Sequence, residues 1–263
     1  MRPVIITLTT DFGIGGSYVA AVKGVLLERA PGAQLVDVCH TISPQNILEG
    51  GFVLANLVDV FPEGTVHLAV VDPGVGTERR LLACSVARQW FVLPDNGLIT
   101  GVTRHHPPDE IREITNPSIR RAFVSATFHG RDILAPAAAH LALGRPAEEL
   151  GPPRSKFITL RNFEPMTDGE GFLGEVIFKD TFGNLITNIH IDRLGDTPGE
   201  PWRLEIAGER ISGIVRTYGD CPPGTLVALS GGSGWIEVAV VNGDAGRLLT
   251  AGPGTTVRLR REG

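Results

Sequence analysis

Strand-like and helix-like segments alternate along the first third of the chain, and this order constrains the fold more than any other feature. The apolar runs at residues 4–10, 33–39 and 65–71 are typical of buried strands. Between them, residues 17–30 and 44–61 carry apolar side chains at helical spacing. A βαβαβ order predicts an α/β sheet that is mostly parallel, with right-handed crossover connections.

A hairpin and a further helix follow this alternating region. Residues 81–87 and 90–94 are short apolar runs separated by a turn, which predicts two antiparallel strands. Residues 131–144 predict one more helix. From residue 144 to 171 the chain is rich in proline, glycine and charge, a composition typical of a linker.

Short strand-like segments separated by turns make up the rest of the chain. They predict a small all-β domain, a barrel or a sandwich, and lie at residues 172–180, 185–191, 202–208, 226–245 and 256–261. We therefore expect an α/β fold with a mostly parallel N-terminal sandwich domain over residues 1–150. A linker over residues 151–170 and a smaller, barrel-like β domain over residues 171–263 complete the expected organisation.

Charge and cysteine content argue against several classes of protein. The net charge of -5 gives no electrostatic reason to expect a nucleic-acid partner, and no lysine- and arginine-rich run predicts membrane binding. No apolar run approaches the ~20 residues that span a bilayer. The 3 cysteines lack CxxC spacing, which favours free thiols in a reducing compartment over disulfides or zinc. We expect a cytoplasmic protein.

Polar residues follow several predicted strands, at the edge where open α/β sheets bind ligands. Asp11 precedes a glycine-rich turn that lacks the lysine of a phosphate-binding loop. It either caps this turn or accepts two hydrogen bonds from a vicinal diol such as a ribose. Asp72 opens the segment "DPGVGTERR", which places an acid and two arginines around a glycine turn. Asp95 follows the second strand of the predicted hairpin.

Two histidines in loops are candidates for either a structural or a chemical role. His129 lies in "FHGRD", just before a predicted helix, and His40 follows the second predicted strand. No set of histidine and acidic residues has metal-ligand spacing, so we expect no metal site. The sequence also lacks the GxSxG turn of serine hydrolases.

The β domain carries two polar and aromatic segments that fit either hairpin turns or a ligand site. The first contains Asp180, Phe182 and Asn184, and the second contains Trp235 and Glu237. If these segments form a ligand site, the rings of Phe182 and Trp235 flank a flat base. Asp180 and Asn184 then bind the polar edges of a ligand or an ammonium group.

Seven segments together resemble the S-adenosyl-L-methionine (SAM) hydroxide adenosyltransferases, the water-using relatives of the bacterial fluorinase and chlorinase. They occur in family order along nearly the whole chain: "TLTTDFG", "PQNILEGGFVLA", "VVDPGVGTERR", "LPDNGL", "TFHGRD", "FGNLITNI" and "SGWIEVAV". The resemblance implies a homotrimer, with active sites between the N-terminal domain of one subunit and the C-terminal domain of its neighbour.

The resemblance also implies a reaction and the residues that perform it. SAM and water would give adenosine and L-methionine, with SAM as the substrate and no further cofactor. The family's catalytic set falls on Asp72, Arg79 and His129, and its ribose-binding acid falls on Asp11. Asp180 and Asn184 match positions that hold the methionine or adenine end, and the C-terminal binding loop falls on Ser233 and Glu237.

Attack on the ribose C5′ releases the neutral thioether of methionine, so the chemical demand falls on the nucleophile. Asp72 and His129 can accept the proton of a water molecule that Arg79 orients, and either can be the final acceptor. The halide enzymes have tyrosine at the position of Asp72, and the fluorinase has serine at that of Gly130. An anion 4 Å from a carboxylate would be repelled by ~4 kcal/mol at an effective dielectric near 20.

Two alternatives to hydrolysis remain open. One is a halide-using alkyltransferase of the same fold. The other is a protein that binds adenosine or SAM without turning it over, although the intact set of Asp72, Arg79 and His129 opposes this.

Overall fold

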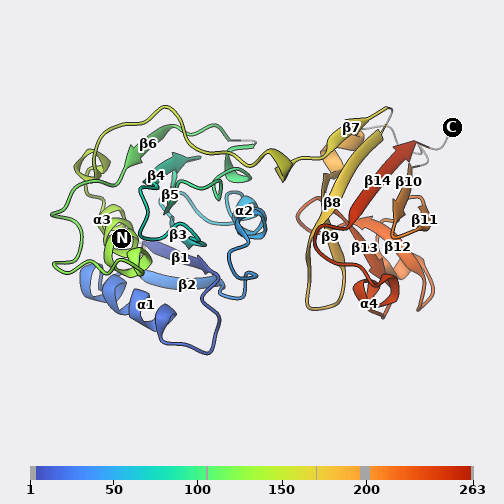
Figure 1. Ribbon diagram of the computed structural model, residues 1–263, viewed down its shortest axis with the longest axis horizontal. Coiled ribbons are helices and arrows are strands. Elements are labelled where there is room, and N and C mark those ends of the chain that lie inside the picture. The colour runs from blue at the N-terminus through green and yellow to red at the C-terminus, as the bar shows by residue number, and fades with distance from the viewer. Residues whose placement is uncertain (1–3, 105, 170, 196–201, 262–263) are drawn as a thin grey trace. The chain divides into compact units, whose positions relative to one another are not determined.

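The computed structural model describes residues 4–104, 106–169, 171–195 and 202–261. The chain divides into two compact units, Met1–Leu160 and Arg161–Gly263. The first is an α/β unit and the second is built from antiparallel strands (Figure 1).

A six-stranded mixed sheet forms the centre of the first unit, in the order β2-β1-β3-β5-β4-β6. Four strands run parallel, and β4 and β6 are antiparallel to their neighbours. The sheet therefore confirms the mostly parallel α/β class. Its strands are β1 (Ile5–Thr10), β2 (Gln34–Cys39), β3 (Val66–Val70), β4 (Leu81–Val86), β5 (Gln89–Pro94) and β6 (Glu110–Glu113).

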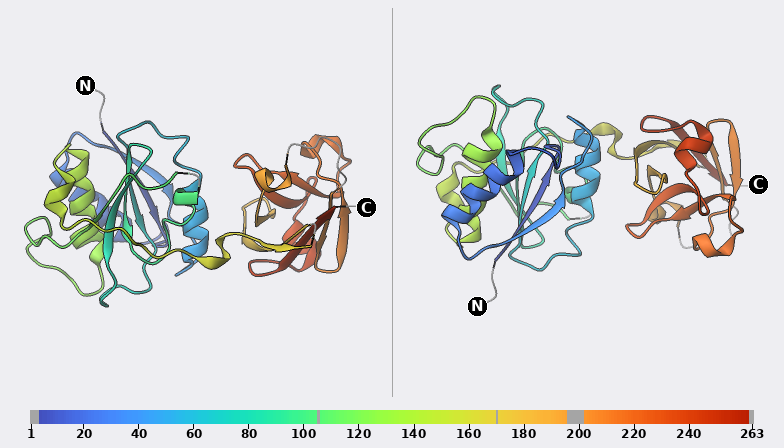
Figure 2. Two further views of the ribbon diagram at one scale, coloured as in Figure 1. Left: turned by 90° about the horizontal axis from the view of Figure 1, so that it is seen from above. Right: turned by 90° about the horizontal axis from the view of Figure 1, so that it is seen from below.

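Helices cover both faces of this sheet (Figure 2). Helices α1 (Tyr18–Arg29) and α3 (Ala135–Ala142) pack together on one face, and α2 (Ile47–Ala55) lies on the other. Side chains of a strand point alternately to the two faces, as β3 shows. Leu68 and Val70 belong to the apolar cluster beneath α1 and α3, and Ala69 belongs to the cluster beneath α2.

The predicted helix over residues 44–61 is too long at both ends. Gln45 has a left-handed backbone with φ 65°, and Asn46 caps the helix by accepting a hydrogen bond from the Glu49 N–H at 3.1 Å. The α-helix ends at Ala55, and turns continue the chain as far as Val60. The helix predicted at 131–144 differs too, since it opens with a wide π-type turn at Gly130–Leu134 before α3 begins.

The parallel pairing of β1 with β3 places two predicted site segments at one edge of the sheet. Thr10 at the end of β1 is in register with Val70 at the end of β3. The loops that begin with Asp11 and Asp72 therefore leave the sheet side by side.

The second unit is an antiparallel sheet that is nearly closed, in the order β11-β10-β14-β8-β9-β13-β12, with β7 paired to β8. The segment after β11 meets β12 through a bridge between Val215 and Leu229. This arrangement confirms the expected barrel-like β fold. Its strands are β7 (Met166–Asp168), β8 (Gly171–Lys179), β9 (Leu185–His190), β10 (Trp202–Ile206), β11 (Glu209–Ser212), β12 (Leu226–Ser230), β13 (Trp235–Val240) and β14 (Thr256–Arg261).

One short helix, α4 (Ala245–Leu249), follows β13 and was not predicted from the sequence. Asp244 caps it by accepting a hydrogen bond from the Arg247 N–H at 2.7 Å. Across the described parts of both units, no helix combines the length and the apolar character needed to cross a bilayer.

Candidate active site

A glycine turn after β3 folds the chain back so that Arg79 reaches Asp72. The turn is closed by hydrogen bonds from the Val75 N–H to the Asp72 carbonyl at 3.2 Å and from the Thr77 N–H to the Gly74 carbonyl at 3.1 Å. Gly76 has φ +80°, and a Cβ there would lie 2.6 Å from the Ala126 carbonyl oxygen. Only glycine fits this close approach, which brings the turn against the loop that carries His129.

Asp72 and Arg79 form a bidentate ion pair. Arg79 Nε lies 2.8 Å from Asp72 Oδ1, and Arg79 Nη2 lies 2.5 Å from Oδ2. Both side chains are largely buried, with 5% of Asp72 and 10% of Arg79 exposed. A fork-to-fork pair of this kind fixes the orientation of the carboxylate as well as its charge.

His129 joins the same cluster through its Nδ1 atom, which lies 3.0 Å from Arg79 Nη2. A guanidinium only donates hydrogen bonds, so Nδ1 must be the acceptor and the neutral ring carries its proton on Nε2. Burial, and next the positive charge of Arg79, lower the pKa of His129 below its ordinary value. The ring is therefore neutral at neutral pH.

A buried aspartate holds the loop that presents His129. Asp132 has a fully buried side chain that accepts hydrogen bonds from Arg131 Nε at 2.7 Å and Arg121 Nη1 at 3.1 Å. It also accepts one from the Ser125 N–H at 2.9 Å. Asp132 thus ties both ends of the segment before α3 to one carboxylate, which explains the aspartate in "FHGRD".

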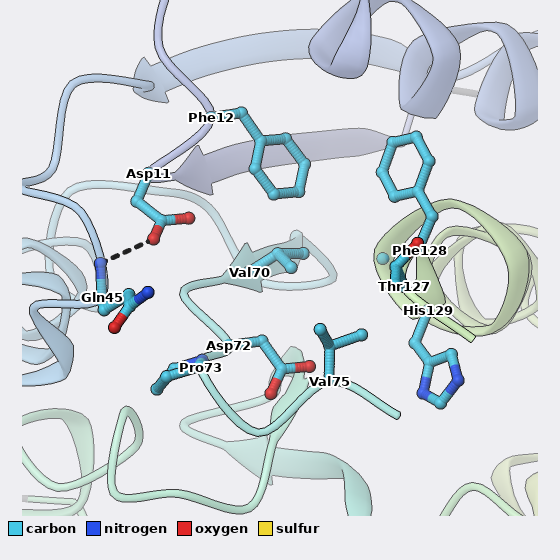
Figure 3. A pocket seen from close by; sticks show the side chains of 11 residues that line it. Asp11, Phe12, Gln45, Val70, Asp72, Pro73, Val75, Thr127, Phe128 and His129 are labelled. Atoms are coloured by element: carbon cyan, nitrogen blue, oxygen red, sulfur yellow. Dashed lines mark hydrogen bonds between the residues drawn. The ribbon is translucent and has the colours of Figure 1, made fainter. Parts of the chain in front are cut away.

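Asp72 and His129 border a cavity of about 240 Å³ at the carboxyl edge of the sheet (Figure 3). The cavity brings together Asp11, Asp72 and His129, three of the predicted site residues, and Arg79 bonds the last two without lining the cavity itself. Asp11 Oδ2 accepts a hydrogen bond from the Gln45 N–H at 2.9 Å, and its other oxygen faces away from Gln45. The cavity is lined by Asp11, Phe12, Gln45, Val70, Asp72, Pro73, Val75, Thr127, Phe128, His129 and Gly130.

The third strand-end acid, Asp95, has a structural environment instead. Its side chain is 1% exposed and accepts hydrogen bonds from Arg80 Nε at 2.8 Å and from the Ile158 N–H at 2.7 Å. The adjacent arginines of "TERR" therefore serve two different aspartates, and only the Arg79 pair borders the cavity.

In the second unit, Asp180, Phe182 and Asn184 border another cavity, of about 570 Å³. Asp180 Oδ1 accepts hydrogen bonds from the Phe182 and Asn184 N–H groups, both at 2.9 Å. This turn leaves Phe182 78% exposed. Asp180, Phe182 and Asn184 thus lie together at one cavity of the second unit.

Tyr218, which no sequence pattern indicated as a site residue, also borders this second cavity. Its hydroxyl donates a hydrogen bond to Glu237 and accepts one from Asn184 Nδ2 at 3.3 Å. Glu237 is 7% exposed, and burial raises its pKa. Tyr218 lies between two predicted strands, and the one available signal was that it is among only 2 tyrosines in the chain.

The structure does not bring Trp235 and Ser233 to this cavity. Trp235 is 4% exposed and packs edge-to-face on Phe163 and His190, with ring centroids 5.9 and 4.8 Å away. The prediction that the Trp235 ring flanks a base is therefore wrong, because this ring packs against other side chains within the unit. Ser233 lies in the turn between β12 and β13, where its carbonyl accepts a hydrogen bond from His190 Nε2 at 3.2 Å.

Comparisons with known proteins cover nearly the whole chain. The SAM hydroxide adenosyltransferase N-terminal domain matches residues 6–151, and the C-terminal domain of the same name matches residues 174–258. A protein from Thermus thermophilus named "(R)-S-adenosyl-L-methionine hydrolase" is 43% identical over 98% of this chain and 100% of its own length. A "Fluorinase" from Nocardia brasiliensis is 31% identical over 79% of each chain.

A solved structure shares the fold. The crystal structure of an uncharacterised conserved protein from Thermotoga maritima superposes with a TM-score of 0.90 at 35% identity, covering 97% of this chain and 100% of that one.

Proposed function

The chain belongs to the SAM hydroxide adenosyltransferase family, and we propose that it hydrolyses SAM to adenosine and L-methionine with Asp72, Arg79 and His129 acting on the water. One observation carries this assignment of roles. Arg79 bonds both Asp72 and His129 at the wall of a cavity that also contains Asp11.

The reaction is an in-line displacement at C5′ of the ribose. The water oxygen forms a bond to C5′ while the C5′–S bond breaks and its electron pair goes to sulfur. Methionine leaves as a neutral thioether and needs no proton, so no general acid is required. The sulfonium is already an activated leaving group, and the proposed reaction therefore uses no metal or other cofactor.

Asp72 is the proton acceptor in this mechanism. Attack by neutral water creates an alkyl oxonium, a far stronger acid than a carboxylic acid, and Asp72 takes its proton to leave the 5′-hydroxyl of adenosine. Arg79 occupies one side of the carboxylate and leaves lone pairs on the other. General-base assistance of this kind contributes about 10²–10⁴-fold to the rate.

His129 and Asp11 position the two reactants. The Nε2–H of neutral His129 donates to one lone pair of the water, which directs the other toward C5′. Asp11, held by the Gln45 N–H, accepts hydrogen bonds from the ribose diol with its remaining lone pairs.

The ligand residues of the second unit support an oligomeric enzyme. We propose that Asp180, Asn184 and Glu237 bind the methionine or adenine end, and that a homotrimer completes each site from two subunits, as the family resemblance implies. Neither Glu237 nor Ser233 borders that cavity: Glu237 reaches it through its hydrogen bond with Tyr218, and Ser233 contributes less directly. The cytoplasm is the proposed location, where Cys39, Cys84 and Cys221 stay as thiols.

Water is favoured over halide by the residues around the proposed nucleophile. Asp72 would repel an entering anion. Gly130 lies where the fluorinase has serine, and a Cβ there would lie 3.1 and 3.3 Å from the Val70 methyl groups.

The relative from Thermus thermophilus is named for the (R) form of the substrate, and we propose that this chain also prefers the (R) sulfonium.

Incubation with (R)- and (S)-SAM in ¹⁸O-water tests the function. We expect adenosine with the label in its 5′-hydroxyl, formed faster from the (R) form. In the presence of chloride, more 5′-chloroadenosine than adenosine would instead favour the halide alternative. Tight adenosine binding without turnover over hours would favour a binding protein.

Co-expression of two inactive variants tests the shared site. An Asp72→Asn subunit and an Asp180→Ala subunit together should recover about a quarter of wild-type activity, because random mixing restores one site in four. Recovery near zero would mean that each site is built from one chain.

A further inference from the structure

His40 directly follows β2 and lies beside the loop that carries Asp11. It is 9% exposed, and both of its ring nitrogens have partners. Nδ1 lies 2.9 Å from Thr10 Oγ1, and Nε2 lies 3.0 Å from Asp37 Oδ1. Asp37 is in turn paired with Lys23 Nζ at 2.6 Å.

The partners fix the direction of each hydrogen bond of the neutral ring. Thr10 Oγ1 accepts from the Phe12 N–H at 3.3 Å, and its own proton is left to donate to Nδ1 of His40. The Asp37 carboxylate only accepts, so it selects the tautomer with the proton on Nε2. The Thr10 hydroxyl is thereby held in one orientation, immediately before Asp11.

The backbone of His40 holds the same loop on the other side of Asp11. Its carbonyl accepts a hydrogen bond from the Gly13 N–H at 2.7 Å, where Gly13 has φ 73°. Five residues after His40, the Gln45 N–H bonds the Asp11 carboxylate directly. The segment from His40 to Gln45 therefore contacts Thr10, Asp11 and Gly13 in turn.

From these contacts we propose that His40 is a positioning residue, which fixes Asp11 for the ribose through Thr10 and Gly13. The inference rests on the proposed function, since it takes Asp11 as the ribose-binding acid. Residues Gly13, Gly15 and Gly16 make the loop after Asp11 intrinsically permissive. A flexible loop loses conformational entropy when it binds a diol, and this loss weakens binding. Hydrogen bonds on both sides of Asp11 order the loop in advance and so reduce the loss.

A second histidine in the same sheet provides a matched control. His67 in β3 bonds Thr7 Oγ1 at 2.7 Å through Nδ1 and Gln89 Oε1 at 2.7 Å through Nε2. It is fully buried and stacks on Phe91, with ring centroids 4.5 Å apart. This threonine–histidine pair has the chemistry of the Thr10–His40 pair but lies in mid-strand, away from the Asp11 loop.

The test measures KM and kcat for SAM in variants of both pairs. His40→Leu and Thr10→Val should each raise KM about tenfold with little change in kcat, and the double variant should be no worse than either one. His40→Asn should restore a KM near wild type, because its Oδ1 occupies the position of Nδ1. Thr7→Val and His67→Leu should lower Tm and leave KM unchanged.

Hydrogen exchange of the Gly13 amide gives a readout independent of turnover. It should become faster in His40→Leu and in Thr10→Val, but not in the control variants. An active wild-type enzyme whose KM is unmoved by Thr10→Val and His40→Leu, or moved equally by the controls, would overturn the positioning role alone. A wild-type chain that does not hydrolyse SAM would overturn the proposed function, and the role of His40 with it.

Discussion

Arg79 donates a hydrogen bond from Nη2 to Nδ1 of His129 across 3.0 Å, and this contact determines how the imidazole can act. Nδ1 must carry a lone pair, so the proton of the neutral ring lies on Nε2. A ring in this tautomer can orient a water molecule by donating to it, but it cannot take the water's proton at Nε2. The contact therefore supports Asp72 as the base, a choice that the sequence left open.

The pH profile of kcat/KM tests this state of His129. Protonation at Nδ1 would replace the Arg79 bond by repulsion between two cations, so the rate should fall in acid. Burial and then Arg79 lower the pKa of His129 from its ordinary 6.5. We therefore expect a level rate at neutral pH and an acid limb centred below 6.5. In His129→Asn this limb should disappear, and its persistence there would assign it to another group.

Asp72→Asn should lower kcat by about 10²–10⁴-fold, because the amide cannot accept the proton of the oxonium. SAM binding, measured by calorimetry, should change only a few-fold. Asp95→Asn is a matched control, since Asp95 pairs with the neighbouring Arg80 and bonds the Ile158 N–H. It should lower stability and leave kcat near wild type. Equal losses of kcat in both variants would show that the Asp72 effect is structural.

The sequence predicted the elements whose pattern is local. The buried strands β1 and β3 and the helix α1 follow from apolar spacing, and their order implies a parallel sheet with Asp11 and Asp72 at one edge. The bounds of α2 were wrong because the left-handed backbone of Gln45 and the cap at Asn46 do not appear in apolar spacing.

Contacts between distant segments were beyond the sequence patterns. Antiparallel pairing of β9 with β13 brings Asn184, which precedes β9, near Glu237, and Tyr218 bonds both from the turn at Tyr218–Asp220. Trp235 resembles a stacking platform in sequence, yet the packing of Phe163 and His190 occupies its ring. Site residues given by local motifs are thus easier to predict than those created by tertiary packing.

Stability of the first unit should depend on pH through His67. Burial lowers the pKa of His67 to about 4, whereas an unfolded histidine titrates near 6.5. Between these two pH values the unfolded state binds more protons than the folded state. The contribution of neutral His67 to the free energy of unfolding is therefore complete above pH 6.5 and is lost as pH falls toward 4. The loss is roughly 3 kcal/mol at most.

Hydrogen exchange of the slowest β3 amides measures this effect. The wild-type free energy of opening should fall between pH 6.5 and 4 more steeply than that of His67→Gln, which is expected to be less stable at pH 7. Parallel slopes in the two proteins would exclude His67 as the source.

An alkaline titration tests the network of the second unit. Burial, then the hydrogen bond to Glu237, raises the pKa of Tyr218 well above its ordinary 10.0. The chain has 2 tyrosines, so Tyr18→Phe leaves Tyr218 as the sole phenol. This variant should show no phenolate absorbance at pH 10, where an ordinary tyrosine is half ionised. Adding Glu237→Gln should bring the transition down toward 10, because it removes the adjacent carboxylate. A transition already near 10 in Tyr18→Phe would mean that Tyr218 is solvated and does not hold Asn184 and Glu237 together.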